Sequence, residues 1–227
     1  MHIEPGVVNG AKMALGYATA IGVMAYTAKL ALGTIRKDGP AALAIRSLIA
    51  TVLVFTFFQV LPHHPVGVSE VHLILGSTLF LMFGAAPAAI GLALGLLVQG
   101  LFFAPADLPQ YGMNVTTLLV PLMAISFLAR RIIPANTAYK DVSYAQCLAL
   151  STAFQGGIVT WVAFWAVYGQ GLGMGTLTEV ATFGAAYMTV ILIEPLVDMA
   201  VLAIAKASHR IAGSVVFHPR LSIPAAN

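Results

Sequence analysis

The chain opens with three nitrogen donors that could bind one metal ion. They are the α-amine of Met1 and two atoms of His2, its backbone nitrogen and its imidazole. These atoms, called here the N-terminal chelate, can close two adjoining rings on one metal and leave a fourth position open. Such a nitrogen set suits Ni(II), Cu(II) or a similar ion. The alternative is that His2 is only the second residue of a frayed terminus.

The residues that follow are consistent with a chelate at the first residue. Pro5-Gly6 favours a type II turn, because Pro fits its first central position and Gly its second. The opening lacks the basic segment and the small-residue cleavage site of a secretory signal, so we expect the mature protein to begin at Met1. Residues 1–7 would then form a metal-binding N-terminal segment.

Composition places these residues in a membrane protein. Of 227 residues, 59% are hydrophobic and only 8% are charged, and the mean hydropathy is +0.92. A soluble domain is about one-quarter charged. The net charge of +3 does not indicate a nucleic-acid partner, because the basic residues fall at the ends of apolar segments. Cys147 is the single cysteine, which excludes an intramolecular disulfide and a multi-cysteine metal site.

The whole chain, residues 1–227, is predicted to form one all-α bundle. Seven apolar segments compare with the roughly 20 residues that a helix needs to span a bilayer. These predicted transmembrane helices cover residues 8–35, 41–61, 71–85, 87–104, 113–133, 143–168 and 177–206. Pro87 separates the third from the fourth, because proline is tolerated in the first turn of a helix but not in its interior.

Positively charged residues lie on one side of this arrangement. With the N-terminus outside, nine of the eleven Lys and Arg residues fall in inner loops or at inner helix ends: Arg36, Lys37, Arg46, Arg130, Arg131, Lys140, Lys206, Arg210 and Arg220. The outer loops, 62–70, 105–112 and 169–176, contain no Lys or Arg. Because cytoplasmic loops carry the excess of basic residues, we predict an extracytoplasmic N-terminus and a cytoplasmic tail, residues 207–227, in the cell inner membrane.

This topology gathers histidines at the outer face. His63, His64 and His72 belong to the same side as the N-terminal chelate, whereas His209 and His218 belong to the inner tail. We expect the two tail histidines to be solvated residues of the membrane interface. An outer histidine could fill the position that the chelate leaves open.

Two acidic residues in the last segment support other functions. Glu194 and Asp198 lie one turn apart, and carboxylates inside a membrane mark functional sites by default. They could serve an ion-coupled secondary transporter, or an intramembrane metal-dependent enzyme if histidines reached the same depth. Alternatively, Arg130, Arg131 or Lys206 could pair with them at the inner side.

Four short stretches resemble one family, in the same order along the chain. They are Met1-His2-Ile3 with Gly6, Val68-Ser69-Glu70-Val71-His72-Leu73, Leu96-Leu97-Val98-Gln99-Gly100-Leu101-Phe102-Phe103, and Tyr111-Gly112-Met113-Asn114. This pattern is similar to that of the CbiM/NikM family, the substrate-binding S components of energy-coupling-factor (ECF) transporters for cobalt and nickel. In that family the second stretch begins a short helix.

The resemblance implies a ligand set. The amine of Met1, the backbone nitrogen and imidazole of His2, and the imidazole of His72 would bind the transported Co(II) or Ni(II). Gln99 and Asn114 would orient these ligands, or serve as polar packing between helices. Three roles stay open for His63 and His64 together: collecting metal at the mouth of the site, replacing His72, or forming part of a loop.

The resemblance also implies partners and the absence of enzymatic activity. The chain has no phosphate-binding glycine loop ending in Lys-Ser or Lys-Thr, so ATP hydrolysis would come from separate ATPase subunits. A transmembrane coupling (T) protein and, often, a small accessory membrane protein would complete the assembly. Glu4-Pro5 fits neither the cobalt nor the nickel openings of the family well, so the choice of metal stays open, with cobalt favoured.

Overall fold

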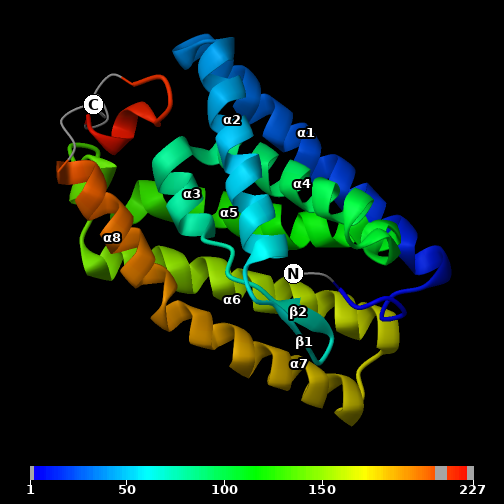
Figure 1. Ribbon diagram of the computed structural model, residues 1–227. Coiled ribbons are helices and arrows are strands. Elements are labelled where there is room, and N and C mark those ends of the chain that lie inside the picture. The colour runs from blue at the N-terminus through cyan, green and yellow to red at the C-terminus, as the bar shows by residue number, and fades with distance from the viewer. Residues whose placement is uncertain (1–2, 208–213, 224–227) are drawn as a thin grey trace.

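The computed structural model describes residues 3–207 and 214–223, and this part of the chain is a bundle of helices with one small hairpin (Figure 1). The α-helices are α1 (Met13–Asp38), α2 (Pro40–Phe55), α3 (Gly76–Phe83), α4 (Ala85–Phe102), α5 (Tyr111–Ile132), α6 (Tyr144–Gln170), α7 (Met174–Met188) and α8 (Glu194–Ala207). The hairpin joins β1 (His64–Val66) to β2 (Ser69–Val71). Shorter helical segments are η1 (Gly10–Lys12), the π-helix η2 (Thr56–Val60), η3 (Pro105–Gln110), η4 (Tyr139–Asp141), η5 (Thr189–Leu192) and η6 (Pro219–Leu221).

Local sequence signals explain several helix boundaries. Gly39, with φ of 88°, separates α1 from α2, and Gly84, with φ of 90°, separates α3 from α4. Pro87 lies in the first turn of α4, as predicted. Ser143 begins α6 with a capping box, in which its hydroxyl accepts from the Gln146 backbone and the Gln146 side chain accepts from the Ser143 backbone.

The third predicted transmembrane helix, residues 71–85, differs from the structure. Helix α3 begins only at Gly76 and has 8 residues, about 12 Å against a hydrocarbon core of about 30 Å. The residues before it are held in the hairpin, so β2 occupies the place where a short helix was expected. The last predicted helix, residues 177–206, is interrupted by η5 between α7 and α8.

Five helices of the described chain are long and apolar enough to cross a membrane by length and composition. They are 10–38, 40–60, 85–102, 105–132 and 144–170. Large apolar side chains on the surface of this set, such as Ile21, Leu48 and Phe102, are 66–73% exposed, which suits contact with lipid. An all-α polytopic membrane fold is therefore consistent with the structure.

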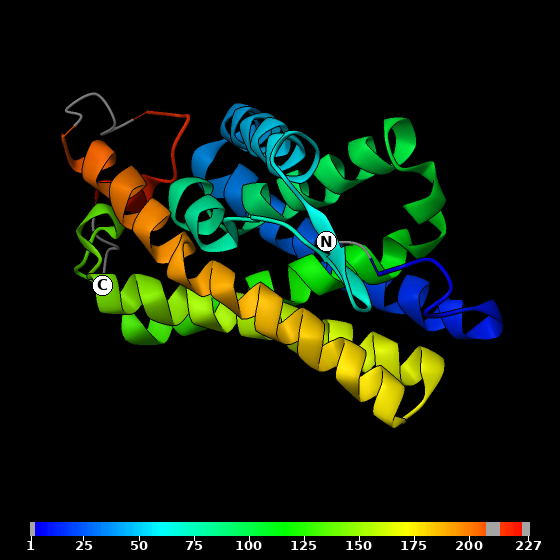
Figure 2. The same ribbon diagram turned by 60° about the horizontal axis from the view of Figure 1, so that its bottom comes forward.

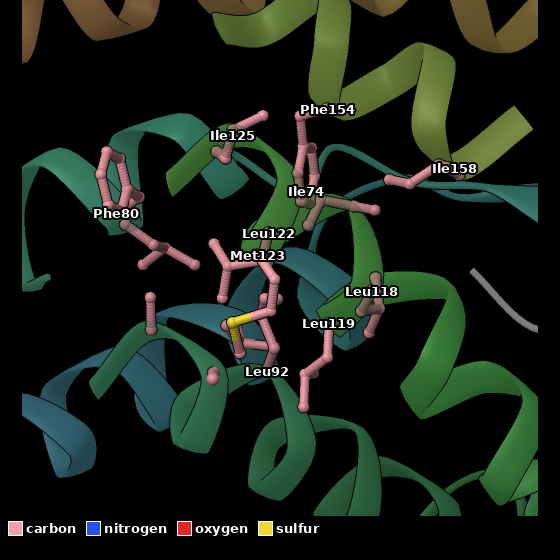
Figure 3. Packing of buried hydrophobic residues seen from close by; sticks show 14 of the residues in the cluster. Ile74, Phe80, Leu92, Leu118, Leu119, Leu122, Met123, Ile125, Phe154 and Ile158 are labelled. Atoms are coloured by element: carbon pink, nitrogen blue, oxygen red, sulfur yellow. The ribbon is translucent and has the colours of Figure 1, made fainter. Parts of the chain in front are cut away.

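The core forms around α5, the most buried of these five helices. Figure 3 shows Leu118, Leu122 and Met123 of α5 packed between Leu92 of α4 and Phe154 of α6. Close packing of this kind holds membrane helices together, because lipid provides no hydrophobic force between them. Figure 2 shows α7 and α8 running along α6, with the C-terminal segment at one end of the bundle and the hairpin nearer the other.

Candidate metal site

The hairpin brings two of the predicted histidines together. In its register His64 pairs with Val71 and Val66 pairs with Ser69, so His63 and His72 come to adjacent positions beyond the paired ends. Their rings are stacked, with centroids 4.9 Å apart and planes 13° apart. Gly67 makes the turn with φ of 60°, a conformation that glycine adopts at no steric cost. His64 itself is exposed on β1.

His72 is buried between the hairpin and α3, and its surroundings orient the ring. The residue is 1% exposed. Its Nε2 lies 2.9 Å from Oε2 of Glu70, and its ring centroid lies 5.3 Å from that of Phe58. A carboxylate at one ring nitrogen is the arrangement that fixes the orientation of metal-ligating histidines. Glu70 was part of a quoted stretch, but its contact with His72 was not predicted.

The N-terminal segment, residues 3–8, lies against the same hairpin. Ile3 forms a bridge with Ser69 of β2, and the backbone N–H of Glu4 donates to the Val68 carbonyl at 3.2 Å. The N–H of Ile3 donates to Oδ1 of Asn114 at 2.8 Å. Ile3 and Asn114 are each 1% exposed, so this hydrogen bond is fully buried. Asn114 thus holds the chain just after His2, and its role in orienting metal ligands stays a prediction.

The predicted turn after Glu4 is confirmed. Gly6 has φ of 97°, and the N–H of Val7 donates to the carbonyl of Glu4 at 3.1 Å. This geometry matches a type II turn with Pro5 and Gly6 at its centre. The turn directs the chain away from the hairpin toward α1, so Ile3 stays at the site while the next residues leave it.

Gln99 supports the site from α4. Its Nε2 donates to the carbonyl of Phe58 at 3.2 Å and to Oε1 of Gln59 at 3.3 Å, both in the π-helix η2. π-helical turns are rare and often occur at functional sites. Gln99 thereby holds the turn that packs Phe58 on His72, and it acts on the histidine through the packing of that ring.

The described residues do not complete a metal site. No group of three His, Cys, Asp or Glu side chains capable of holding a metal occurs in residues 3–207 and 214–223. The two first residues of the predicted ligand set, Met1 and His2, lie outside the described residues. The structure therefore brings together His63, His72, Asn114 and the start of the described chain at Ile3.

The carboxylates of Glu194 and Asp198 lie in a separate place. Asp198 accepts hydrogen bonds from the hydroxyls of Ser77, at 2.8 Å, and Thr78 on α3. Glu194 accepts from the hydroxyl of Ser151 on α6 at 2.8 Å. Both carboxylates are buried, 0% and 1% exposed. They hold the broken end of the last predicted helix to its neighbours, and within the described residues they form no group of three metal-binding side chains with a histidine.

The predicted basic partners of these carboxylates are wrong. Lys206 pairs with Asp141, with 3.2 Å between Nζ and Oδ1, and the ion pairs of the described chain include none between Arg130 or Arg131 and a carboxylate. Hydroxyl groups are short and can follow the carboxylates into the helix interface, whereas Arg130 and Arg131 are exposed at the end of α5.

His218 also differs from its expectation. The ring of His218 stacks on that of Tyr139, with centroids 5.8 Å apart. The backbone N–H of His218 donates to the Met82 carbonyl at 2.8 Å. It is therefore half-buried and packed against the end of the bundle, where a fully solvated side chain was expected. His209, the other tail histidine, lies outside the described residues.

Crystal structures of metal transporters share this fold. One described as a truncated transition metal transporter aligns with a TM-score of 0.69 over 92% of this chain and 100% of that chain, at 19% identity. Another, described as a transition metal transporter, aligns with a TM-score of 0.68 over 91% of this chain and 93% of that chain, at 20% identity. The fold is thus that of a class of membrane proteins that includes transition-metal transporters.

Sequence comparison gives the family. The model of the CbiM family, the cobalt uptake substrate-specific transmembrane region, matches residues 2–211, and the chain belongs to this family. A protein of Haemophilus influenzae described as a metal transport protein is 29% identical over 143 residues. That match covers 62% of this chain and 63% of the relative, so the chain spans less than two thirds of the relative's length. The family resemblance predicted from four short stretches is confirmed.

Proposed function

We propose that this protein is the membrane substrate-capture subunit of an ECF-type ABC transporter that imports a divalent transition metal. Co(II) is favoured, in keeping with the description of the family, and Ni(II) is the alternative. The metal is the transported substrate. In this proposal the subunit is not an enzyme, and ATPase subunits, a T protein and a small accessory membrane protein are its partners.

One observation carries the proposal: the buried hydrogen bond from the Ile3 N–H to Asn114. It fixes Ile3, the residue that follows His2, beside the hairpin that His72 directly follows. Ile3 pairs antiparallel with Ser69, so a chain that continues this pairing toward its start follows β2 in the direction of Glu70 and His72.

The proposed ligands are the amine of Met1, the backbone nitrogen and imidazole of His2, and the imidazole of His72. Four nitrogen donors form the tetragonal set that suits Ni(II) and similar ions. Asn114 positions the chelate through Ile3, and Glu70 orients the His72 ring. His63, stacked on His72, covers the site or collects metal on its way in.

The proposed topology has seven spans, an extracytoplasmic N-terminus and a cytoplasmic C-terminus in the inner membrane. In this arrangement α3 is a short span that does not cross alone, and the broken pair α7 and α8 completes the last crossing. The basic residues at the other end of the bundle support this orientation.

An N-terminal extension tests the proposal. Residues added before Met1 convert its amine into an amide, so we expect the extended protein to lose high-affinity Co(II) and Ni(II) binding. The same residues added after Asn227 should leave binding intact. Metal content of the purified protein and titration calorimetry give the readout.

Removal of the extension provides the control for folding. A protease that regenerates Met1 as the first residue should restore binding to the extended protein. Equal metal content in the two tagged forms would show that the amine is not a ligand.

A further inference from the structure

A second polar site lies at the end of the bundle away from the hairpin. It is a cavity of about 780 Å³, bounded by the second half of α1, the start of α4, the end of α5, η4 and the C-terminal segment, residues 214–223. This volume is within the range of about 300–1,000 Å³ that small-molecule sites have. The metal site proposed above uses none of the residues that line it.

The cavity is strongly basic. Lys29 and Lys37 of α1, Arg130 of α5 and Arg220 of the C-terminal segment line it. Asp38 is the single acidic residue among the described lining residues, and its Oδ2 is engaged by Arg46 at 2.5 Å. The four lining cations themselves form no ion pair within residues 3–207 and 214–223. No carboxylate of the described residues pairs with these four charges.

Contacts with the protein hold the Arg220 side chain in place. Its guanidinium lies 4.7 Å from the ring centroid of Tyr139, and its Nη2 donates to the carbonyls of Ile133, at 3.3 Å, and Pro134, at 2.9 Å. Its Nε is buried and has no hydrogen-bond partner among the described residues. A guanidinium fixed in this way loses little conformational freedom when an anion binds.

Neutral groups complete an environment suited to an anion. The start of α4, Gly84 and Ala85, lines the cavity, and the N–H groups of a helix's first turn point toward a bound anion. Thr34 and Ser126 also line the cavity, but their hydroxyls donate to the backbone carbonyls of Leu30, at 3.2 Å, and Met123, at 2.8 Å. Burial, and then the charge of Arg46, lower the pKa of His218 to about 4, so its ring is neutral at pH 7. Its Nδ1 accepts from the Arg220 backbone N–H at 3.2 Å, so Nε2 carries the ring proton and can donate one hydrogen bond.

We propose that this cavity binds a phosphate group. A fixed guanidinium, ammonium groups and a helix N-terminus are donors that recognise phosphate oxygens. The cavity lies at the end of α1 and α5, two helices apolar enough to cross a membrane, so the group comes either from the headgroup of an anionic lipid or from a soluble phosphate. The inference is independent of the metal site.

A charge-matched pair of variants tests the proposal in the full-length protein. The double variant Lys37→Gln/Arg130→Gln removes two lining cations. The control Arg36→Gln/Arg131→Gln removes the same charge from the neighbouring positions of the same helices, where the side chains are exposed and do not line the cavity. All four side chains are exposed, so both variants should fold.

Two probes distinguish a lipid headgroup from a soluble phosphate as the source of the phosphate group. Phosphatidylglycerol is titrated against phosphatidylcholine in detergent micelles, with bound lipid counted by native mass spectrometry, and inorganic phosphate is titrated as a competitor. We expect phosphatidylglycerol to bind the natural protein and the control, and the double variant to bind at least about tenfold more weakly, because charge-assisted hydrogen bonds to phosphate are lost.

Displacement of the lipid by inorganic phosphate, or phosphate binding without lipid, identifies a soluble phosphate as the ligand. Lipid binding that phosphate does not displace identifies the headgroup. An equal loss in the two double variants would show a general effect of surface charge, and no loss in either, or no binding of either probe, would also overturn the site.

Discussion

A terminal segment folds back onto each end of this bundle, and the two segments are held by different chemistry. At the hairpin, Ile3 is held by a strand and by the amide of Asn114, both neutral. At the other end, the C-terminal segment is held by guanidinium groups: Arg46 Nε donates to the Val215 carbonyl at 2.9 Å, and Arg220 donates to two carbonyls of the α5–α6 connection.

The difference has electrostatic consequences. Neutral donors and the carboxylate of Glu70 surround the buried His72, so a cation can approach that end without repulsion. At the other end, the Lys and Arg residues around the cavity have no ion-pair partner in the part of the chain that the structure describes, and their charge would repel a metal cation. The proposed cation site and the proposed anion site thus lie at opposite ends of one fold.

The largest expected effect concerns the placement of the two ends across the membrane. In a Cys147→Ala background, Ala106→Cys near the hairpin end should react with an impermeant thiol reagent on intact cells, and Asn136→Cys at the basic end should not. Both positions are exposed, so accessibility does not separate them. The reason is the absence of Lys and Arg from the loop at 105–112. The reverse labelling would place the histidines in the cytoplasm and end the uptake proposal.

The next effect compares one histidine at each end. His72→Ala removes a proposed ligand and should weaken Co(II) binding by more than about 100-fold, beyond the 10–100-fold that loss of an outer partner causes. His218→Ala should bind Co(II) like the natural protein, because this residue packs on Tyr139 at the basic end. Calorimetric titration with a native N-terminus measures both.

Two further variants sharpen the assignment of the ligand. Glu70→Gln keeps the shape of the side chain that orients the His72 ring, so its loss of affinity should stay within the 10–100-fold range. If His72→Ala binds normally and His63→Ala does not, the fourth ligand is the neighbouring ring and the assignment of His72 is wrong.

The sequence predicted the elements with strong local signals. Composition indicated the membrane bundle, Pro5-Gly6 indicated the turn, and four of the predicted spans, residues 8–35, 41–61, 87–104 and 143–168, correspond to α1, α2 with η2, α4 and α6. The span at 113–133 corresponds to α5. These features depend on residues close together in the chain.

Contacts between distant residues explain what was missed. From the sequence alone, the hairpin residues were predicted to form a polar loop followed by a helix. The pairing of His64 with Val71 was missed because it depends on the packing of the hairpin against α7 and the N-terminal segment. The hydroxyl partners of Asp198 come from Ser77 and Thr78 of α3, 121 and 120 residues earlier, whereas the basic residues were considered as partners because the predicted topology placed them at the same inner side of the membrane. Asn114 was found only through a family resemblance, although its contact with Ile3 is direct.

The smallest effect we predict tests whether the N-terminal segment must lie in one position for metal to bind. Gly169, near the end of α6, lies against this segment. A Cβ there would clash with the carbonyl oxygen of Val7, and it would also lie 2.8 Å from the Val7 carbonyl carbon and 2.9 Å from Cγ2 of Val8. Val7 and Val8 are buried, so Gly169→Ala must displace backbone.

We expect Gly169→Ala to weaken Co(II) binding by about tenfold, the lower limit for loss of an orienting contact, because the ligands remain but the chain that carries them shifts. Alanine is the better helix former by about 1 kcal/mol, so melting of α6 cannot explain a loss. Gly156→Ala is the matched control, because that glycine lies in the same helix and a Cβ there meets nothing within 4 Å. If Gly169→Ala binds Co(II) as tightly as the natural protein, the position of residues 7–8 is not coupled to the metal site. The hydrogen bond between Ile3 and Asn114 would then have to fix the chelate alone.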